Sequence, residues 1–347
     1  MVNTSFTRDV QFPALPLEEW EDTKSTLHLF LQVVGKVRLS LHPKMNHWWH
    51  VPFYVSVRGL TTGSIPYEDM TFEMEFNFRD SGHTLKIETS EGDSKTVPLK
   101  GLSVAGFYEK VFSSLNELGI VAGIRPVPYD IPGVTEPFVS DYEHASYDEE
   151  YVNRFWRILV QVDSVFKVFR GWFTGKGSPV HFFLAPRDLA FTLFSGRSAP
   201  VREGANPVER EASSHEMISF GFWAGDRNVR EPAFYAYVHP QPQDIMDERL
   251  SLKKLSGAGK QEKLSLCTNM SETQLTRLKK LYLTSLKAYI RQEQREQTGI
   301  SELSGFLHLK SSLKDRLKRN RESIRVYWKS WKGLMIELKL KRSVRFC

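Results

Sequence analysis

The sequence predicts an α+β domain made mostly of antiparallel sheet with two or three long helices packed on it, followed by a basic helical extension. Apolar residues recur at helical spacing in some stretches and alternate with polar residues in others. The chain has 347 residues, 41% of them apolar, which is enough for a large core. Charge changes sign along the chain: residues 1–247 contain 23 Lys and Arg against 32 Asp and Glu (23 − 32 = −9), and residues 248–347 contain 24 against 9 (24 − 9 = +15).

These observations predict four regions. A flexible lead-in covers residues 1–14, an α+β domain residues 15–247, a linker residues 248–270, and a basic amphipathic helical tail residues 271–347. The linker is rich in Ser, Lys and Gly. In the tail, apolar residues recur at helical spacing over residues 271–297 and 312–340 among many Lys and Arg.

The first helix is expected over residues 17–41, because Trp20, Leu27, Phe30 and Val34 recur near helical spacing. Alternation then predicts an antiparallel meander that is solvated on one face. Its strands are expected at residues 50–58, 70–79, 85–89 and 96–99.

A second helix is expected over residues 104–118, with Ser103 as its N-cap and Gly119 as its stop. Residues 120–128 are expected to add a strand, and residues 149–173 a second long helix. Four further strands, rich in aromatic residues, are predicted at residues 180–184, 188–194, 216–223 and 233–239.

The two halves of this domain have a similar plan, which admits an internal duplication. Leu31-Gln32-Val33 and Val160-Gln161-Val162 occupy similar places in the two long helices, and His50 and His181 follow at comparable distances. The alternative is that a helix followed by a sheet recurs by chance.

We expect a cytoplasmic protein without a transmembrane segment. Both cysteines, Cys267 and Cys347, lie in the tail, so neither a disulfide nor a thiolate metal site can hold the first 247 residues together. The N-terminus has no apolar run typical of a signal peptide. No stretch approaches the ~20 apolar residues that cross a bilayer.

Several sequence blocks occur in one order over about residues 15–242. The chain resembles a mainly bacterial family of domains of unknown function in these blocks. They are Trp20-x-x-Thr23-x-x-Thr26-Leu27-His28, Gln32-x-Val34-Gly35-Lys36, Asn46-His47-Trp48-Trp49-His50-Val51-Pro52, Glu143-His144-Ala145-Ser146-Tyr147-Asp148, Ser178-Pro179-Val180-His181-Phe182-Phe183, Ser214-His215-Glu216 and Pro232-Ala233-Phe234-Tyr235-Ala236-Tyr237. The resemblance implies no activity, and the basic tail departs from it.

Histidines in polar or turn-like surroundings are the first candidate site residues. Neutral imidazoles and a carboxylate together suit a divalent transition metal. The candidate ligands are His47, His50, His181, His215 and Glu216. A metal-dependent enzyme is therefore one reading. The alternatives are imidazoles that hydrogen-bond the backbone, and a pocket without metal.

That pocket is our preferred interpretation: a small-molecule-binding domain, with or without catalysis, whose cleft is lined by histidines and aromatic residues. Arginines are included because they can clamp a carboxylate or phosphate. The candidate ligand-binding residues are His47, Trp48, His50, Arg58, His144, Tyr147, His181, Arg197, His215, Glu216 and Trp223.

Two familiar kinds of catalytic site are absent from the sequence. No Gly-x-Ser-x-Gly elbow occurs, and Gly257-Ala258-Gly259-Lys260 lacks both the glycine spacing and the Ser or Thr of a phosphate loop. A third functional interpretation is an interaction protein. Its basic tail, with Trp328 and Trp331, would contact an anionic membrane surface, nucleic acid or the acidic body of the same protein. The alternative for the tail is a solvated extension or a gene-model artefact.

Overall fold

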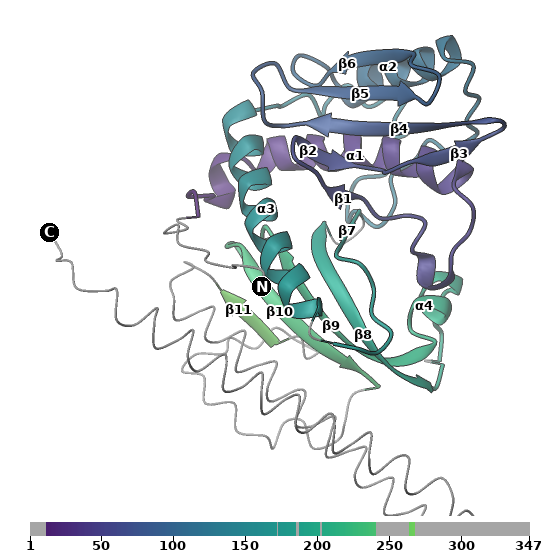
Figure 1. Cartoon of the computed structure of the whole chain (residues 1–347). Helices are drawn as coiled ribbons and strands as arrows, with labels where there is room; N and C mark the ends of the chain where they lie inside the picture. The colour runs from purple at the N-terminus through teal and green to yellow at the C-terminus, as the bar shows by residue number, and fades with distance from the viewer. Residues whose placement is uncertain (1–11, 172, 185–186, 202, 241–263, 268–347) are drawn as a thin grey trace, which may run out of the picture. The chain divides into compact units, whose positions relative to one another are not determined.

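A computed structural model describes residues 12–171, 173–184, 187–201, 203–240 and 264–267 (Figure 1). They form two antiparallel sheets and several helices, which confirms the predicted α+β class. The whole of the predicted tail, residues 271–347 with its two basic helices, lies outside the described residues. None of the helices in the described part is long and apolar enough to cross a membrane.

The first half begins with a short 3-10 turn, η1 (Leu17–Glu19), and the long helix α1 (Glu21–Leu41). A second 3-10 turn, η2 (Asn46–Trp48), precedes the first sheet, in which β1, β2, β4, β5 and β6 are neighbours in that order and β3 pairs with β4. The strands are β1 (Tyr54–Val55), β2 (Gly59–Thr61), β3 (Ile65–Tyr67), β4 (Met70–Asn77), β5 (Thr84–Thr89) and β6 (Ser94–Pro98). Helix α2 (Val104–Glu117) follows, and the hydroxyl of Ser103 caps it by accepting from Gly106 N at 3.2 Å.

The second half repeats a long helix followed by a meander. Helix α3 (Glu149–Gly171) leads into a sheet in which β7, β8, β9, β10 and β11 are neighbours in that order. The strands are β7 (His181–Phe183), β8 (Asp188–Ser198), β9 (His215–Trp223), β10 (Ala233–His239) and β11 (Leu264–Cys267). A short helix, α4 (Pro207–Ala212), lies between β8 and β9.

Three segments differ from expectation. Residues 120–128 form no strand: Ile120 N bonds Leu115 O and so closes helix α2, and Val121 N bonds the hydroxyl of Tyr67. The strand expected at residues 50–58 is only two residues long, because η2 and its turn occupy the region before it. Residues 264–267, which the sequence assigns to a linker, form β11 and pair with β10.

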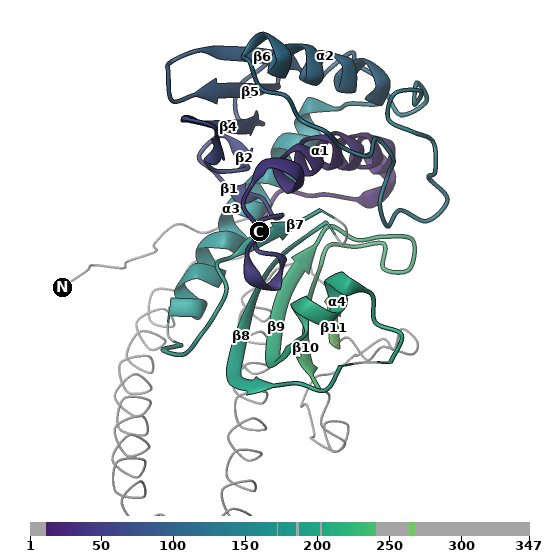
Figure 2. The same ribbon diagram turned by 90° about the vertical axis from the view of Figure 1, so that its right-hand side faces the viewer.

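In both halves, aromatic side chains join the helices to the sheet. In the first half, the ring of Phe30 on α1 stacks on Phe107 of α2 with centroids 4.1 Å apart, and Phe107 contacts Phe76 of β4 at 6.3 Å. In the second half, Phe166 on α3 meets Phe191 of β8 at 5.2 Å. Helix α3 runs along the second sheet in both views (Figures 1 and 2).

A single bridge joins the two sheets and relates the two halves. Phe53, just before β1, exchanges two backbone hydrogen bonds with Phe182 of β7, at 2.9 and 2.8 Å. These residues are 129 positions apart (182 − 53 = 129), and so are Gln32 of α1 and Gln161 of α3 (161 − 32 = 129). Phe53 therefore pairs with the residue at the same offset in the second half, which is the pairing expected if the two halves are related by a two-fold axis.

Each long helix also hydrogen-bonds the first strand region of the other half. The ring of His28 on α1 donates to Leu184 O after β7 at 2.7 Å, and the indole of Trp156 on α3 donates to Ser56 O after β1 at 3.3 Å. The reciprocal contacts favour the predicted duplication over a chance recurrence.

Candidate functional site

The two faces of the second sheet have different chemistry. Side chains of successive residues in a strand point to opposite faces. The face toward α3 is apolar, and it carries Phe182, Leu189, Leu193, Ile218, Phe191, Phe220, Phe222 and Phe234. The other face, which we call the polar face, carries His181, Asp188, Thr192, Ser219, Trp223, Tyr235, Tyr237 and His239. The same strands therefore pack against the core through one face and carry polar side chains on the other.

A buried tyrosine–aspartate pair lies on the polar face near the end of the sheet where β8 begins. The hydroxyl of Tyr235 donates to the carboxylate of Asp188. Burial, and then the charge of Asp188, raise the pKa of Tyr235 well above its usual range, so the phenol stays protonated. The ring of Tyr235 lies across Gly221, where a Cβ atom would come within 2.1 Å of it. Glycine at position 221 is what allows the pair to form.

Three side chains of the polar face have buried polar atoms without a hydrogen-bond partner among the described residues. These atoms are both ring nitrogens of His181, the indole nitrogen of Trp223 and Nε2 of His239. His181 is 0% exposed, and burial together with the charge of Arg38 lowers its pKa to about 3, so the ring is neutral. Buried polar groups of this kind cost roughly 1–3 kcal/mol each when unpaired.

The loop of η2 lies over one corner of the polar face. The ring of His47 packs on Phe194 of β8 at 4.6 Å and meets the ring of His215 of β9 at 5.5 Å. Trp49 contacts His47 at 5.3 Å and His181 at 5.8 Å, so it lies between the two imidazoles. Three predicted site residues, His47, His181 and His215, are thus brought together around Trp49 and Phe194.

The backbone of this loop is in a rare conformation. His47 and Trp48 are consecutive and both have positive φ, at 56° and 61°. Bulky residues seldom adopt this region, and such strain persists only where surrounding contacts fix it. The contacts of His47 with β8 and β9 are contacts of that kind.

Lys176 places a cation at the edge of the same corner. Its ammonium donates to Nε2 of His47 at 2.8 Å and lies 5.0 Å from the ring centre of Phe194. Nδ1 of His47 is 3.4 Å from Ala212 O, so it carries the proton. Burial, and then the charge of Lys176, lower the pKa of His47 and keep it neutral.

Trp48 and His50 belong to the same loop but contact each other. Their ring centres are 5.3 Å apart, and Nδ1 of His50 accepts from Met45 N at 3.2 Å. Lys44 lies over the ring of Trp48 and pairs with Glu211 of α4. These contacts hold the loop against α4.

Arg197 and Glu216, predicted as an anion clamp and a metal ligand, form an ion pair with each other at 2.8 Å. Ser195 also donates to Glu216 at 2.8 Å. The pair spans β8 and β9 at the irregularity in their register between Phe194 and Ser198. Each residue therefore already has a partner of opposite charge.

Two predicted site residues lie near α2. His144 donates to the carboxylate of Asp141 at 2.8 Å, and its backbone carbonyl accepts from Val104 N at the start of the helix. The hydroxyl of Tyr147 is 3.0 Å from Nδ1 of His83. These contacts stabilise the connection to α3, and the structure does not bring the two side chains to the polar face.

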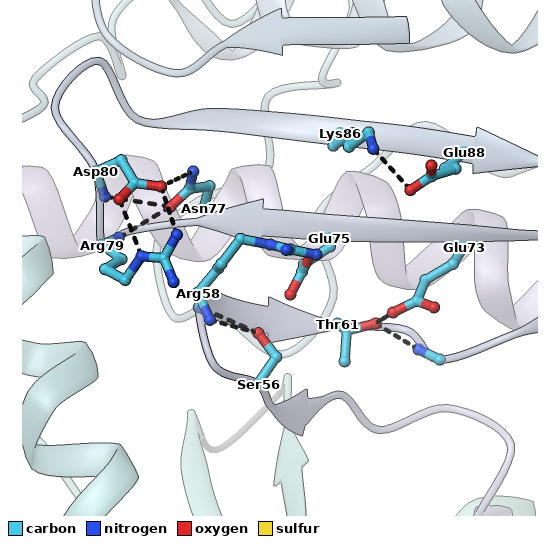
Figure 3. A network of polar contacts seen from close by, with 12 residues as sticks. Ser56, Arg58, Thr61, Glu73, Glu75, Asn77, Arg79, Asp80, Lys86 and Glu88 are labelled. Carbon is cyan, nitrogen blue, oxygen red and sulfur yellow. Dashed lines mark hydrogen bonds and ion pairs between the residues drawn. The ribbon is translucent and has the colours of Figure 1, made fainter. Parts of the chain in front are cut away.

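Arg58 belongs to a charged network on the first sheet (Figure 3). Its guanidinium donates to the carboxylate of Glu75 at 2.8 Å through Nε. In the same network Thr61 donates to Glu73, and Arg79 donates to Asp80 at 2.9 Å. Arg58 is therefore a structural ion-pair residue in this arrangement.

The five predicted metal ligands lie wholly within the described part of the chain. There, no group of three or more His, Cys, Asp or Glu side chains has an arrangement that could hold a metal ion. The arrangement of these residues gives no support to the metal-dependent reading.

Sequence reasoning missed Asp188, His239 and Lys176 as members of the site. The sequence does contain a pattern that indicates Asp188. Asp188, Ala190 and Thr192 alternate with three large apolar residues, which predicts that one face of β8 is polar. Lys176 lies before β7, and no local pattern connects it to His47, 129 residues earlier (176 − 47 = 129).

Comparison with known proteins identifies the family but no activity. A family of unknown function, DUF5996, matches residues 12–258. No curated protein and no solved structure matches the chain. Because the family model covers most of the sequence, the chain belongs to DUF5996. The match extends beyond Pro242, where the resemblance of the sequence blocks ended.

Proposed function

We propose that this member of DUF5996 binds a small, uncharged, planar polar molecule on the polar face of its second sheet. The observation that carries the proposal is the pair of buried side chains, His181 and Trp223, whose polar atoms have no partner among the described residues. The apolar face of the same strands has no such atoms among the described residues. Unpaired buried groups of this kind are satisfied by a water molecule or a ligand.

The chemistry of these groups selects the class of ligand. The indole of Trp223 only donates, whereas a neutral imidazole both donates and accepts, so the ligand must offer acceptors and donors. The carboxylate of Asp188 and the neutral state of His181 disfavour an anion on this face. The rings of Trp223 and Tyr235, 5.7 Å apart, favour a flat molecule.

The loop of η2 supplies the edge of the proposed site. Trp49 covers His181, and Lys176 places a charge at the outer side of His47. In this proposal His47, His181, His215 and Trp223 from the predicted set take part. His50, Trp48, Arg197 and Glu216 hold the surrounding structure in place.

Nicotinamide and nicotinate test the proposal because they share a ring and differ in charge. We expect nicotinamide to shift the NMR signals of the His181 ring and the Trp223 indole, and nicotinate to bind more weakly. His181→Phe and Trp223→Phe keep the ring but remove the polar atoms, so each should weaken nicotinamide binding about 5- to 10-fold.

Trp156→Phe is the matched control, because its indole already bonds Ser56 O away from the polar face. It should leave nicotinamide binding unchanged. If neither compound moves the His181 and Trp223 signals, or if Trp156→Phe weakens binding as much as Trp223→Phe, the proposed function is wrong.

The proposal also assigns the protein to the cytoplasm and gives the basic tail an anionic partner, whether the acidic body, a membrane surface or nucleic acid. Its support is the charge difference between residues 1–247 and 248–347. Truncation after Asp247 should abolish binding to anionic liposomes or to nucleic acid, measured by co-sedimentation and by electrophoretic mobility. Unchanged binding of the truncated chain would remove the tail from the proposal.

A further inference from the structure

A small cavity lies where α1, α3 and the start of the second sheet meet. Its volume is about 20 Å³. The lining residues are Trp20, Lys24, Leu27, His28, Leu31, Phe155, Phe182, Arg187 and Ala224. This is room for about one water molecule or one small ion, far less than a drug-sized ligand needs. The cavity is separate from the polar face, because Phe182 points to the opposite, apolar face of the sheet.

Two cationic side chains line this mostly apolar cavity. Lys24 is 8% exposed, and its ammonium donates to Gly225 O. The guanidinium of Arg187 makes no hydrogen bond or ion pair within the described residues. Burial, and then the charge of Arg187, lower the pKa of Lys24 to about 8, and burial lowers the pKa of Arg187. The two cations therefore lie close enough to repel each other.

The acidic groups nearby are bound to other partners. Glu21 accepts two hydrogen bonds from Arg230, at 3.0 and 2.9 Å. Asp226 accepts from the backbone of Asn228 at 2.8 Å and from that of Val229 at 2.9 Å, which closes its own turn. Both carboxylates act on Lys24 only through their fields, and neither makes an ion pair with it.

The remaining polar groups of the cavity are donors. The indole nitrogen of Trp20 is buried and has no partner among the described residues, and an indole can only donate. Trp20 is 2% exposed, so bulk water does not satisfy it. The ring of His28 is already bound to Leu184 O, and burial and the charge of Arg187 lower its pKa to about 3, so it adds no charge. Any occupant must accept hydrogen bonds from Trp20 and compensate positive charge.

We propose that the cavity formed by Trp20, Lys24 and Arg187 binds a small monovalent anion of about the size of chloride. Lys24 and Arg187 supply the charge, and the Trp20 indole supplies an additional donor. The apolar walls exclude water, which strengthens the electrostatic attraction. The ion joins α1 to the segment before β8 and so stabilises the contact between the two halves.

The test measures the pKa of Lys24 by NMR of its side chain in the full-length protein. Chloride is titrated against bulky gluconate at constant ionic strength. A bound anion favours the charged ammonium, so chloride should raise the pKa of Lys24 by about 1 unit or more, with saturation. The same titration should raise the melting temperature.

Variants separate a site from general screening. Arg187→Gln and Trp20→Phe should each weaken anion binding about 5- to 10-fold. Arg227→Gln, an exposed arginine in the loop after β9, is the control and should have no effect. If Arg187→Gln fails to fold, Trp20→Phe still provides the comparison.

Two outcomes would overturn the proposal. One is a Lys24 pKa that chloride does not change. The other is a pKa that rises without saturation, equally in gluconate, or a response that Arg227→Gln weakens as much as Trp20→Phe does. The result is independent of nicotinamide binding, so failure here leaves the proposed function standing.

Discussion

The charged network on the first sheet and the cationic cavity beside α1 contain similar groups in opposite states. In the network, Arg58 pairs with Glu75 and Arg79 pairs with Asp80, so every cation drawn has a bonded carboxylate (Figure 3). In the cavity, Lys24 and Arg187 face each other while the nearby acids bond elsewhere. A charged side chain that already has an ion-pair partner contributes little to the binding of a ligand. A charged side chain without such a partner can contribute more, because the ligand supplies the missing opposite charge.

The same contrast separates the imidazoles. His144 is bonded to Asp141 and His47 to Lys176, whereas His181 has no partner on either nitrogen among the described residues. His181 is neutral because it is buried, and no bonded partner holds its proton state. The most useful experiments therefore compare compensated with uncompensated groups.

Acid should have the largest effect. Burial lowers the folded-state pKa of both His28 and His181 from 6.5 to about 3, so the folded protein resists a proton that the unfolded chain accepts. The contribution of these two neutral imidazoles to the free energy of unfolding is present in full above pH 6.5. It is lost as pH falls from 6.5 towards 3. The loss is about 1.4 kcal/mol per pH unit for each imidazole.

Urea unfolding at several pH values between 4.5 and 7.5 measures this slope. His181→Phe should reduce it by about 1.4 kcal/mol per pH unit, whereas His42→Gln, at the half-exposed end of α1, should not change it. An unchanged slope in His181→Phe would show that His181 takes up its proton in the folded state.

Lys24→Met should have the next largest effect. Burial and the charge of Arg187 lower the folded-state pKa of Lys24, so its charged ammonium destabilises the folded protein at pH 7. The wild-type protein should therefore gain stability as pH rises from 8 to 10.5. Removing the ammonium should stabilise the protein at pH 7 by at most about 3 kcal/mol in gluconate buffer, less what the lost bond to Gly225 contributes. Lys86→Met, within the network, is the control and should change stability by less than about 0.5 kcal/mol. A destabilised Lys24→Met variant would mean that the cavity already compensates its charge.

The Arg58–Glu75 pair should have the smallest effect. The side chain of Arg58 is 43% exposed, so water and salt screen the interaction. A double-mutant cycle with Arg58→Met and Glu75→Gln should give a coupling of about 0.5–1 kcal/mol that decreases in high salt. A coupling above about 2 kcal/mol that salt does not change would show that this pair behaves as a buried ion pair. The proposed difference between the exposed network and the cationic cavity would then be wrong.

Local patterns predicted most of the fold. The alternation of Phe72, Met74 and Phe76 with acidic residues identified β4 and its buried face, and Ser103 was correctly predicted as a cap. The strand prediction for residues 120–128 was wrong because Ile120 completes the end of α2 and is buried there. Its apolar side chain therefore belongs to the end of a helix and not to a strand.

The site was only partly predictable, because its members are joined by pairing between distant strands. Residue type alone selected His47, His181 and His215, and the structure brings them together around Trp49. Their register relative to Asp188 and Tyr235 depends on which strands are neighbours, which no local spacing encodes. The cavity was invisible for the same reason: Lys24 and Arg187 are 163 residues apart (187 − 24 = 163).

The bridge between Phe53 and Phe182 has a consequence for how such a fold could arise. Because Phe53 pairs with the residue 129 positions later, the edge of the first sheet binds the corresponding edge of the second sheet. A half-length ancestor with one helix and one meander could have associated with a second copy through this edge. Joining two copies would then need only a connecting segment. The first sheet now carries a charged network, and the second carries a polar, aromatic face.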